Sequence, residues 1–239
     1  MADLTHSNFL QKAGYTFISL LYPNQCLVCK AGRHDSLDPI CDKCVQLFSP
    51  IPVKDRSQLI SVQEGIDEAY VGWGFDDNLR QGIHSLKYEE RAKVGSFLGK
   101  KLGNYLGQLF RDKIDIIVPV PLHHVKYRER GFNQAYWIAK GLSQNWHIPL
   151  EDKLIKRVKH TVSQTTLNRE ERLSNLMQAF QVKKDVDGKR IGIVDDVLTT
   201  GSTISSMATV LKAHGAKNII ALTIATPMEK EDDTYAESV

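Results

Sequence analysis

One stretch near the C-terminus constrains the fold more than any other. Residues 190–197, RIGIVDDV, form a mostly apolar run that predicts a buried β-strand, and the run ends in Asp195 and Asp196. A short loop rich in hydroxyl groups follows, and residues 201–216 have the apolar spacing of a helix. A strand joined directly to a helix is the unit of parallel sheets with right-handed crossovers. The chain is therefore predicted to adopt an α/β fold.

The rest of the chain repeats this alternation. Apolar runs predict strands at 69–77, 114–122, 153–158 and 218–226, and helical spacing is found at 7–22, 94–110 and 132–146. Strands that alternate with helices favour a mainly parallel sheet with helices on both faces. We expect this architecture together with a small N-terminal metal-binding module.

Composition divides the chain into three parts. We expect an N-terminal helix, a cysteine module and a linker in residues 1–60, where the polar stretch with Pro50 and Pro52 marks the linker. The α/β domain is predicted for 61–228, and the acidic residues 229–239 are predicted to be disordered. No apolar run is long enough to span a membrane, and the N-terminus lacks the features of a signal peptide. We therefore expect a cytoplasmic protein.

Four cysteines lie close together in the N-terminal part. Cys26 and Cys29 form one CxxC pair, and Cys41 and Cys44 form a second pair after eleven intervening residues. Two such pairs are typical of a tetrahedral zinc site with four thiolate ligands. A redox site is the alternative, although redox chemistry usually uses a single CxxC pair at the start of a helix. Because four protein ligands leave no open position, the predicted zinc would be structural.

The loop after the strand at 190–197 has the features of an anion site. Successive backbone N–H groups, hydroxyl groups and the start of a helix can surround a phosphate, and Gly201 allows a close approach. Asp195 and Asp196 would repel a phosphate but can accept hydrogen bonds from hydroxyl groups. A ligand such as ribose 5-phosphate carries both groups. A Walker B strand is the alternative interpretation of IVDD, but the sequence contains no GxxxxGK[ST] motif.

The thirteen residues IGIVDDVLTTGST, 191–203, resemble the phosphoribosyl-diphosphate (PRPP) motif of type I phosphoribosyltransferases. The resemblance implies that Asp195 and Asp196 are catalytic and contact the ribose hydroxyls. It also implies that a magnesium ion binds with PRPP. The residues implied to hold the 5-phosphate are Thr199, Thr200, Gly201, Ser202 and Thr203.

Further segments resemble one branch of that superfamily, the competence protein F family. They are VPVPLHHVKYRERGFNQA at 118–135, RVKHTVSQTTLNREERLSN at 157–175, LKY at 86–88 and the cysteine segment, so the resemblance covers about residues 15–226. Members of this family are linked to DNA uptake during natural transformation. The resemblance implies a PRPP-binding protein that handles incoming single-stranded DNA in the cytoplasm, with a DNA-uptake helicase as a partner.

Two basic segments supply the other candidate site residues. The diphosphate and the mobile loop that covers the ligand would involve Leu122, His123, Arg128, Arg130, Arg157, Gln164 and Arg172. Arg172 and Asn175, three residues apart as on one helix face, could instead fix that loop to the body. The adjacent His123 and His124 could also suggest a metal site, but neighbouring histidines do not easily share an ion, so ordinary packing is favoured. The candidates for nucleic-acid contact are Lys87, Lys126, Arg128, Lys159 and Arg169.

Charge is unevenly spread along the chain. Residues 80–172 contain 18 Lys and Arg against 9 Asp and Glu, although the whole chain has a net charge of only +3. Such a basic region suits a polyanion, and a solvated surface rich in lysine is the alternative. Two other functions stay open: a salvage transferase that moves the phosphoribosyl group to a nucleobase, and a non-catalytic scaffold that recruits a helicase. The sequence identifies no base acceptor, so turnover also stays open.

Overall fold

The computed structural model describes residues 25–31, 38–60, 65–84, 91–123, 125, 127–128, 131–158 and 179–227. The helix predicted at 7–22 and the acidic segment 229–239 lie outside these residues. Among the described residues, no helix combines the length and the apolar character that crossing a membrane requires.

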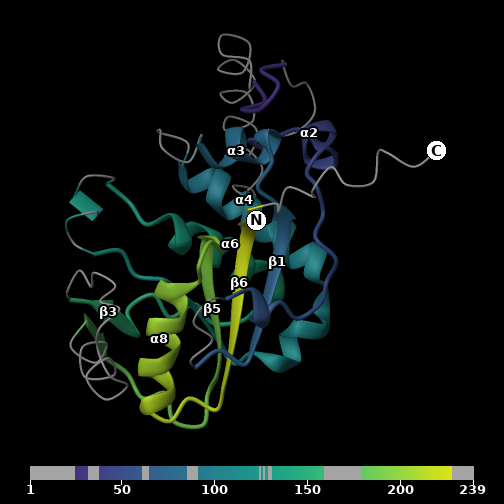
Figure 1. Ribbon diagram of the computed structural model, residues 1–239. Coiled ribbons are helices and arrows are strands. Elements are labelled where there is room, and N and C mark those ends of the chain that lie inside the picture. Colours follow the sequence, from purple (N-terminus) through teal and green to yellow (C-terminus); the bar gives the residue numbers. More distant parts are fainter. Residues whose placement is uncertain are drawn as a thin grey trace, which may run out of the picture.

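A four-stranded parallel sheet forms the centre of the molecule (Figure 1). Its strands lie in the order β1 (Glu68–Gly74), β6 (Asn218–Thr226), β5 (Arg190–Val197) and β2 (Ile116–Pro119). All three strand pairs are parallel, so every carboxyl end lies at the same edge of the sheet. The predicted parallel architecture is confirmed. β5 lies inside the sheet between β6 and β2, which buries its apolar residues from both sides.

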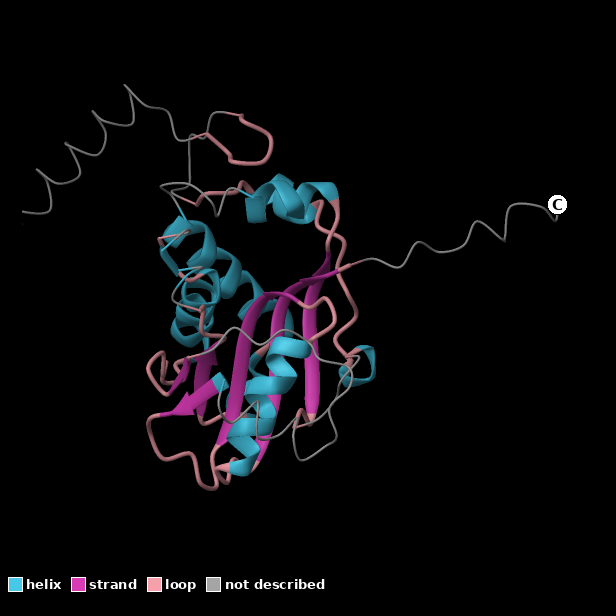
Figure 2. Ribbon diagram, turned by 60° about the vertical axis from the view of Figure 1, so that its left-hand side comes forward, coloured by secondary structure: helices cyan, strands magenta, loops and turns pink. Residues whose placement is uncertain are grey.

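Helices cover both faces of this sheet. α4 (Arg91–Leu106) and α6 (Gln134–Trp146) bury Leu98, Ile138 and Leu142 in one core layer. α8 (Ser202–Ala213) buries Met207 and Leu211 in a second layer on the opposite face (Figure 2). The helices predicted at 94–110, 132–146 and 201–216 therefore exist, although α4 ends at Leu106 and a 3-10 segment, η3 (Gln108–Lys113), follows it.

The glycines within α4 and α6 have a packing role. A Cβ atom at Gly99 would lie 2.0 Å from the carbonyl oxygen of Ile138, and one at Gly141 would lie 2.0 Å from that of Ser96. Neither distance allows a side chain. The two helices therefore approach each other closely at these glycines, which explains why glycine is tolerated inside both helices despite its unfavourable helix propensity.

The strand predicted at 153–158 lies outside the main sheet. β3 (Ile155–Arg157) pairs antiparallel with β4 (Phe180–Val182) in a separate two-stranded sheet. β4 was not expected from the sequence, because it has only three residues and its partner precedes it by more than twenty positions. The small sheet is thus closed by a long-range pairing that local periodicity does not reveal.

The cysteine segment packs against the carboxyl end of β1. It contains α2 (Asp42–Gln46), and Cys26, Ile40, Cys44 and Phe48 belong to the same hydrophobic cluster as α4 and α6. The rings of Phe48 and Trp73 meet edge to face with centroids 5.9 Å apart. The division of the chain at residue 60 stays a prediction, but these two parts share a continuous core.

The stretch predicted as a linker runs along β1. The N–H of Ile51 donates to the carbonyl of Gly72 at 3.0 Å, and the N–H of Arg56 donates to the carbonyl of Ala69 at 2.8 Å. After the short 3-10 helix η1 (Ser57–Leu59), Ile60 is buried with 2% exposure. The described part of this stretch is therefore fixed to the domain by hydrogen bonds and packing.

Candidate functional site

Asp195 and Asp196 lie at the carboxyl end of β5, as the motif predicts. The N–H of Asp196 donates to Oδ1 of Asp195 at 2.9 Å, and the N–H of Val197 donates to Oδ1 of Asp196 at 2.8 Å. Each carboxylate therefore accepts one backbone hydrogen bond, and the side chains of the two acids also interact with each other. Both residues retain partial exposure to solvent.

The environment of Asp195 disfavours its charged form. Burial of the carboxylate and the negative charge of Asp196 raise the pKa of Asp195 well above its usual value, and the guanidinium of Arg157 partly opposes this rise. Hydroxyl donors on a ligand would favour the ionised form by the same rules. The described protein groups thus offset only part of the cost of holding two negative charges at Asp195 and Asp196.

The loop between β5 and α8 begins with a buried anchor. Leu198 has 1% exposure, and its N–H donates to the carbonyl of Ala225 at 2.7 Å. The hydroxyl of Thr226 donates to the carbonyl of Leu198 at 3.1 Å. Both partners belong to β6, whereas the next two residues, Thr199 and Thr200, are exposed. The loop is therefore held at its base and open at its tip.

Gly201 is required where the loop enters α8. Its φ of 69° lies in the left-handed region, which L side chains rarely adopt. A Cβ atom there would lie 2.6 Å from Cγ2 of Ile60. Ile60 thus packs directly behind the loop. This role could not be predicted from the sequence, because Ile60 lies inside the stretch predicted as a linker and no local pattern relates it to Gly201.

The start of α8 can accept an anion. Gly201 is the N-cap residue and provides no side-chain cap for the helix. The Thr200 hydroxyl lies 3.2 Å from that of Ser202 and 3.4 Å from the Ser202 nitrogen, and Thr203 is half-buried in the first turn. The Ser202 N–H donates to the Thr200 hydroxyl, whereas the N-cap residue Gly201 has no side chain to cap the helix. The partial positive charge of a helix N-terminus favours a bound anion. The predicted phosphate residues are therefore brought together.

The loop after β2 lies beside these acids. The N–H of Val120 donates to the carbonyl of Val194 at 2.9 Å, which ties this loop to the end of β5. Leu122 is half-buried, and His123 is buried with 7% exposure. The His123 carbonyl accepts the N–H of Tyr127 at 2.9 Å. His123 is therefore built into the turn, in agreement with ordinary packing, and Arg128 is exposed.

Arg157 reaches the site from the small antiparallel sheet. It follows Ile155 and Lys156 on β3, and its guanidinium lies over the ring of Phe180 with its carbon 5.7 Å from the ring centroid. Desolvation lowers the pKa of Arg157, and the charge of Asp195 raises it. Its Nε is buried and has no hydrogen-bond partner among the described residues. The structure thus brings Arg157 into electrostatic contact with Asp195.

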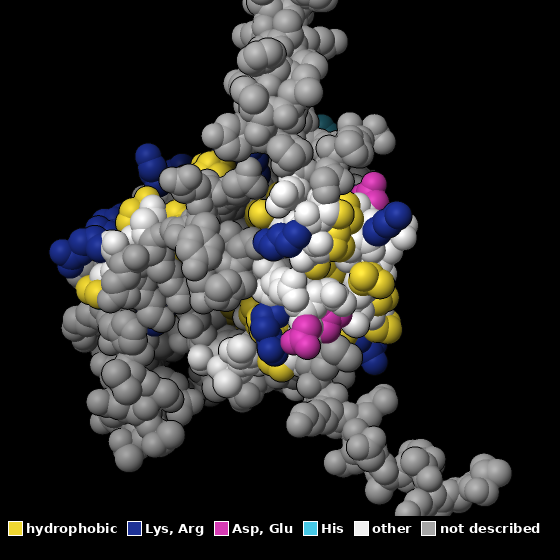
Figure 3. All heavy atoms as spheres, turned by 90° about the horizontal axis from the view of Figure 1, so that it is seen from above, with side chains coloured by type: hydrophobic (Ala, Val, Ile, Leu, Met, Phe, Trp, Pro, Cys, Tyr) yellow, Lys and Arg dark blue, Asp and Glu magenta, His cyan; other side chains and the backbone are white. Residues whose placement is uncertain are grey.

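The other predicted site residues, six of them basic, lie outside the part of the chain that the structure describes. These residues are Lys87, Lys126, Arg130, Lys159, Gln164, Arg169 and Arg172. On the described surface seen from above in Figure 3, Lys and Arg side chains stand at several separate places among hydrophobic and uncharged groups. Contact of these residues with diphosphate or nucleic acid therefore stays a prediction.

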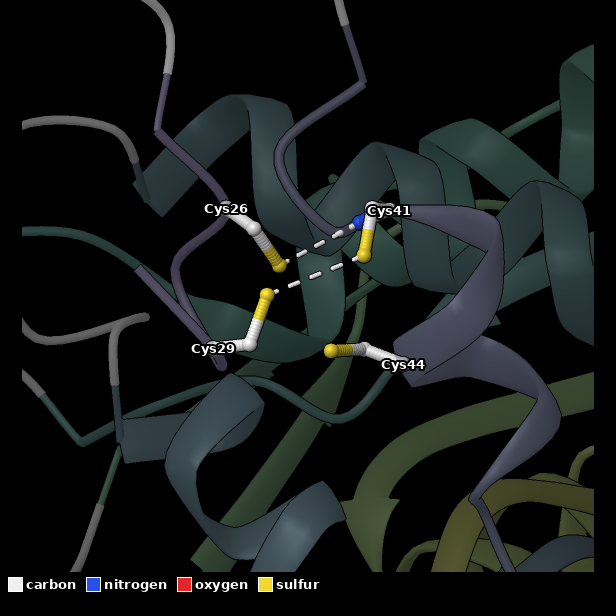
Figure 4. Close-up of side chains that lie close together, drawn as sticks. All are labelled: Cys26, Cys29, Cys41 and Cys44. Carbon is white, nitrogen blue, oxygen red and sulfur yellow. Dashed lines mark hydrogen bonds between the residues drawn. The ribbon is translucent and has the colours of Figure 1, made fainter. Parts of the chain in front are cut away.

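The four cysteines converge on one point (Figure 4). Their sulfur atoms all lie within 4.8 Å of one another, and Sγ of Cys29 lies 3.9 Å from Sγ of Cys41. A tetrahedral metal with bonds of about 2.3 Å to sulfur requires sulfurs about 3.8 Å apart. The donors therefore fit one metal ion. All four cysteines are free thiols, so this structure contains no disulfide between them.

The thiols differ in their ease of ionisation. Burial raises the pKa of the Cys26 thiol, but hydrogen bonds from nearby backbone N–H groups, including that of Cys41 at 3.3 Å, outweigh burial and lower it to about 6. Burial and the neighbouring thiols raise the pKa of Cys44. One thiolate is therefore available near neutral pH to begin metal binding, which releases protons from the remaining thiols.

Hydrogen bonds connect the cysteine segment to the phosphate loop. The carbonyl of Ser49 accepts the N–H of Gly74 at 2.8 Å, and the Ser49 hydroxyl donates to Oδ2 of Asp76 at 2.9 Å. The N–H of Phe75 donates to the carbonyl of Thr226 at 2.8 Å, and Thr226 in turn holds Leu198. The carboxyl ends of β1 and β6 thus lie between the two candidate sites.

Comparison with protein families identifies the main domain. Residues 98–239 match the phosphoribosyl transferase domain, which covers the sheet from β2 onward together with the phosphate loop. The matched region contains Asp195, Asp196 and Gly201. The motif-bearing part of the chain therefore coincides with a domain defined by relatives.

Curated relatives match a larger part of the chain. Competence protein F of Haemophilus influenzae is 39% identical over 82% of this chain and 93% of its own length. DNA utilization protein YhgH of Escherichia coli O157:H7 is 34% identical over 57% of this chain and 62% of its length. Competence protein ComFC of Bacillus subtilis is 25% identical over 89% of this chain and 88% of its length.

Proposed function

The chain belongs to the competence protein F family and carries a phosphoribosyl transferase domain, and on this premise we propose that the carboxyl edge of its sheet binds PRPP. One observation carries the proposal: two neighbouring acids at the end of β5 precede a helix N-terminus whose N-cap residue, Gly201, has no capping side chain. Phosphates favour the helix start, and vicinal hydroxyls favour the acids. PRPP presents both groups on one ribose.

Each part of the ligand has a matching protein group. The 5-phosphate would accept hydrogen bonds from the backbone and hydroxyl groups of residues 199–203. The ribose 2- and 3-hydroxyls would donate to Asp195 and Asp196. The diphosphate would lie toward Leu122 and the loop after β2, which is tied to β5 through Val120. Arg157 would supply positive charge from β3.

The site could also assist transfer of the phosphoribosyl group. Breaking the bond between C1 of the ribose and the diphosphate oxygen leaves positive charge on the ring and negative charge on the leaving group. The two carboxylates would stabilise the positive ring. A magnesium ion, when bound with PRPP, would neutralise the leaving diphosphate. Base-dependent release of diphosphate would identify a salvage transferase.

We further propose a role for this protein in DNA uptake, with single-stranded DNA handled in the cytoplasm. Support comes from the relatives named for competence and DNA utilization and from the excess of basic residues between positions 80 and 172. Binding of single strands by backbone charge weakens steeply with salt. Affinity for a labelled single-stranded oligonucleotide should therefore fall by about 300-fold between 50 and 200 mM salt if about six phosphates are contacted.

Structural zinc is the metal that we propose for the four-cysteine cluster. Four thiolate donors at tetrahedral spacing suit this ion, and they leave no position for a substrate. Cys26 and Cys44 are buried in the shared core, so the metal would stabilise the packing of α2 against β1. The metal content of the purified protein should be one zinc per chain, measured by elemental analysis.

Calorimetric titration with PRPP and magnesium tests the ligand. Wild type should bind, and the variant Asp195→Asn/Asp196→Asn should lose most of this affinity. Asp152→Asn removes an exposed carboxylate outside the site and serves as the control, with unchanged binding expected. Absence of binding by folded, metal-loaded wild type would refute the PRPP proposal and leave a nucleic-acid phosphate as the candidate anion.

A further inference from the structure

Thr223 in β6 is a buried polar residue without an evident structural purpose. Its side chain has 1% exposure, and its hydroxyl oxygen finds no hydrogen-bond partner among the described residues. Most buried hydroxyls in proteins are hydrogen-bonded, because an unpaired one loses its contacts with water without replacement. A buried hydroxyl left unpaired in this way requires an explanation.

The sheet register places Thr223 beside Asp195. The two residues are Cα partners on the parallel strands β6 and β5, and on its other side Thr223 is the partner of Val71 in β1. Neighbouring strands lie about 4.8 Å apart, and register partners project from the same face. That face packs against α8, as the burial of Ile193 and Ala221 with α8 residues shows. Asp195 is therefore the polar neighbour of Thr223 within the sheet.

Packing alone would favour valine at this position. Valine has nearly the same shape as threonine, and it would remove an unpaired hydroxyl from an otherwise apolar strand, NIIALTIAT. A second unpaired donor acts on the same carboxylate. The buried Nε of Arg157 also lacks a hydrogen-bond partner within the described part of the chain, and the charge of its guanidinium acts on Asp195. The Thr223 hydroxyl and the Arg157 Nε are therefore two unpaired donors that are related to the Asp195 carboxylate, the first by sheet register and the second by charge.

We propose that Thr223 is a positioning residue that donates its hydroxyl to the Asp195 carboxylate when ligand is bound and so orients it toward the ribose. This inference rests on the proposed PRPP site. Asp196 on the same strand and Arg157 on β3 are the charged groups that act on Asp195. β6 and β2 contain no ionisable side chain, and the first turn of α8 contains no acidic one.

The test compares Thr223→Val with Thr223→Ser in calorimetric titrations of PRPP with magnesium. Hydrogen bonds to charged groups correspond to a change of about ten- to a hundredfold in affinity. Thr223→Val should therefore bind PRPP about ten- to a hundredfold more weakly than wild type, whereas Thr223→Ser keeps the hydroxyl and should bind within about threefold. Thr209→Val is the matched control, because that hydroxyl instead donates to the carbonyl of Ser205 at 2.9 Å. Its affinity should not change.

Two further readouts separate positioning from a structural role. The unfolding temperature of Thr223→Val should equal or exceed that of wild type, since no hydrogen bond within the unliganded protein is lost. Affinity measured against pH should begin to fall at a higher pH in Thr223→Val, because loss of a donor makes Asp195 easier to protonate.

Three outcomes would overturn the inference. They are unchanged affinity in Thr223→Val, equal weakening in Thr223→Ser, and a loss of affinity that follows a fall in unfolding temperature with no movement of the pH profile. Failure of the PRPP site itself is distinguished by wild type, which would then not bind either.

Discussion

The cysteine segment and the phosphate loop adjoin the same edge of the sheet, but their conformations have different origins. Cys26 and Cys44 bring their thiols together in a segment whose one described helix, α2, has five residues. The phosphate loop is held by β6 through Leu198 and begins a helix of twelve residues. The first region contains little regular secondary structure, whereas the second is joined directly to strands of the sheet.

This difference bears on how each region depends on a ligand. Short segments that cannot bury a core usually need a metal to fold, and binding energy is then folding energy. A loop fixed by strand ends is preorganised and needs its ligand only for function. We therefore expect metal loss to affect stability first and ligand loss to affect activity alone.

Metal removal should have the largest effect on stability, and it tests most severely whether the cysteine segment and the phosphate loop depend on different ligands. Chelation should lower the free energy of unfolding by roughly 5 kcal/mol, because the thiol cluster and its share of the core would open. That loss corresponds to a fall of about 10–20 °C in unfolding temperature, measured by circular dichroism. PRPP affinity should change less than about tenfold. A larger change would mean that the loop also depends on the metal.

Gly201→Ala should produce the next largest effect. The left-handed φ and the contact with Ile60 together should lower the free energy of unfolding by roughly 3 kcal/mol and abolish PRPP binding. Gly188→Ala is the matched control, since its φ of 66° is similar but nothing lies within 4 Å of the added Cβ. Denaturant unfolding should show that this control lowers the free energy of unfolding by about 1 kcal/mol. Equal losses in both variants would show that the Ile60 contact is unimportant.

Asp195→Asn separates stability from function within the loop region. Because burial raises the pKa of Asp195, the folded protein binds this proton more tightly than the unfolded chain does. Protonated Asp195 therefore makes its whole contribution to the free energy of unfolding below about pH 3.8. This contribution is lost as the pH rises through the raised pKa of the folded state. Asp195→Asn should unfold at a higher temperature than wild type at pH 7 and bind PRPP about ten- to a hundredfold more weakly. A lower unfolding temperature at pH 7 would contradict the burial argument.

Ser49→Ala should have the smallest effect. This variant removes the hydroxyl donor to Asp76, but the Ser49 N–H still donates to the same carboxylate at 3.2 Å. Asp76 also accepts the N–H of Leu79 at the start of α3 (Asp77–His84). We expect a loss of about 1 kcal/mol in the free energy of unfolding and unchanged PRPP affinity. Thermal unfolding and titration of the same sample measure both. A loss of affinity without a loss of stability would indicate that the cysteine segment controls the loop through this bond.

Much of the central sheet could be predicted from local sequence. The strands β5 and β6 have the predicted bounds, because their apolar runs are continuous and end at acids or a proline. β2 is shorter than predicted, since Pro119 and Pro121 supply no N–H for pairing. The helix α4 ends before the predicted residue because Gly107 adopts a φ of 82°. The strand order and β4 depend on contacts between distant residues, which periodicity does not contain.

The candidate site likewise contains residues that the sequence could predict and residues that it could not. Asp195, Asp196 and the loop residues follow one another along the chain, so a motif could reveal them. Ile60 and Thr223 could not be found, because each acts through a neighbour more than twenty-five residues away in sequence. In the sequence alone, Ile60 is an apolar residue in a polar stretch and Thr223 is one position in a buried strand.

A crystal structure of the metal-loaded protein with ribose 5-phosphate would test the central claim most directly. The phosphate is expected at the N-terminus of α8, within hydrogen-bond distance of the loop from Thr199 to Thr203. The 2- and 3-hydroxyls are expected to donate to Asp195 and Asp196. A sugar phosphate bound elsewhere, or bound with its phosphate away from this helix, would contradict the assignment of this edge as a phosphoribosyl site.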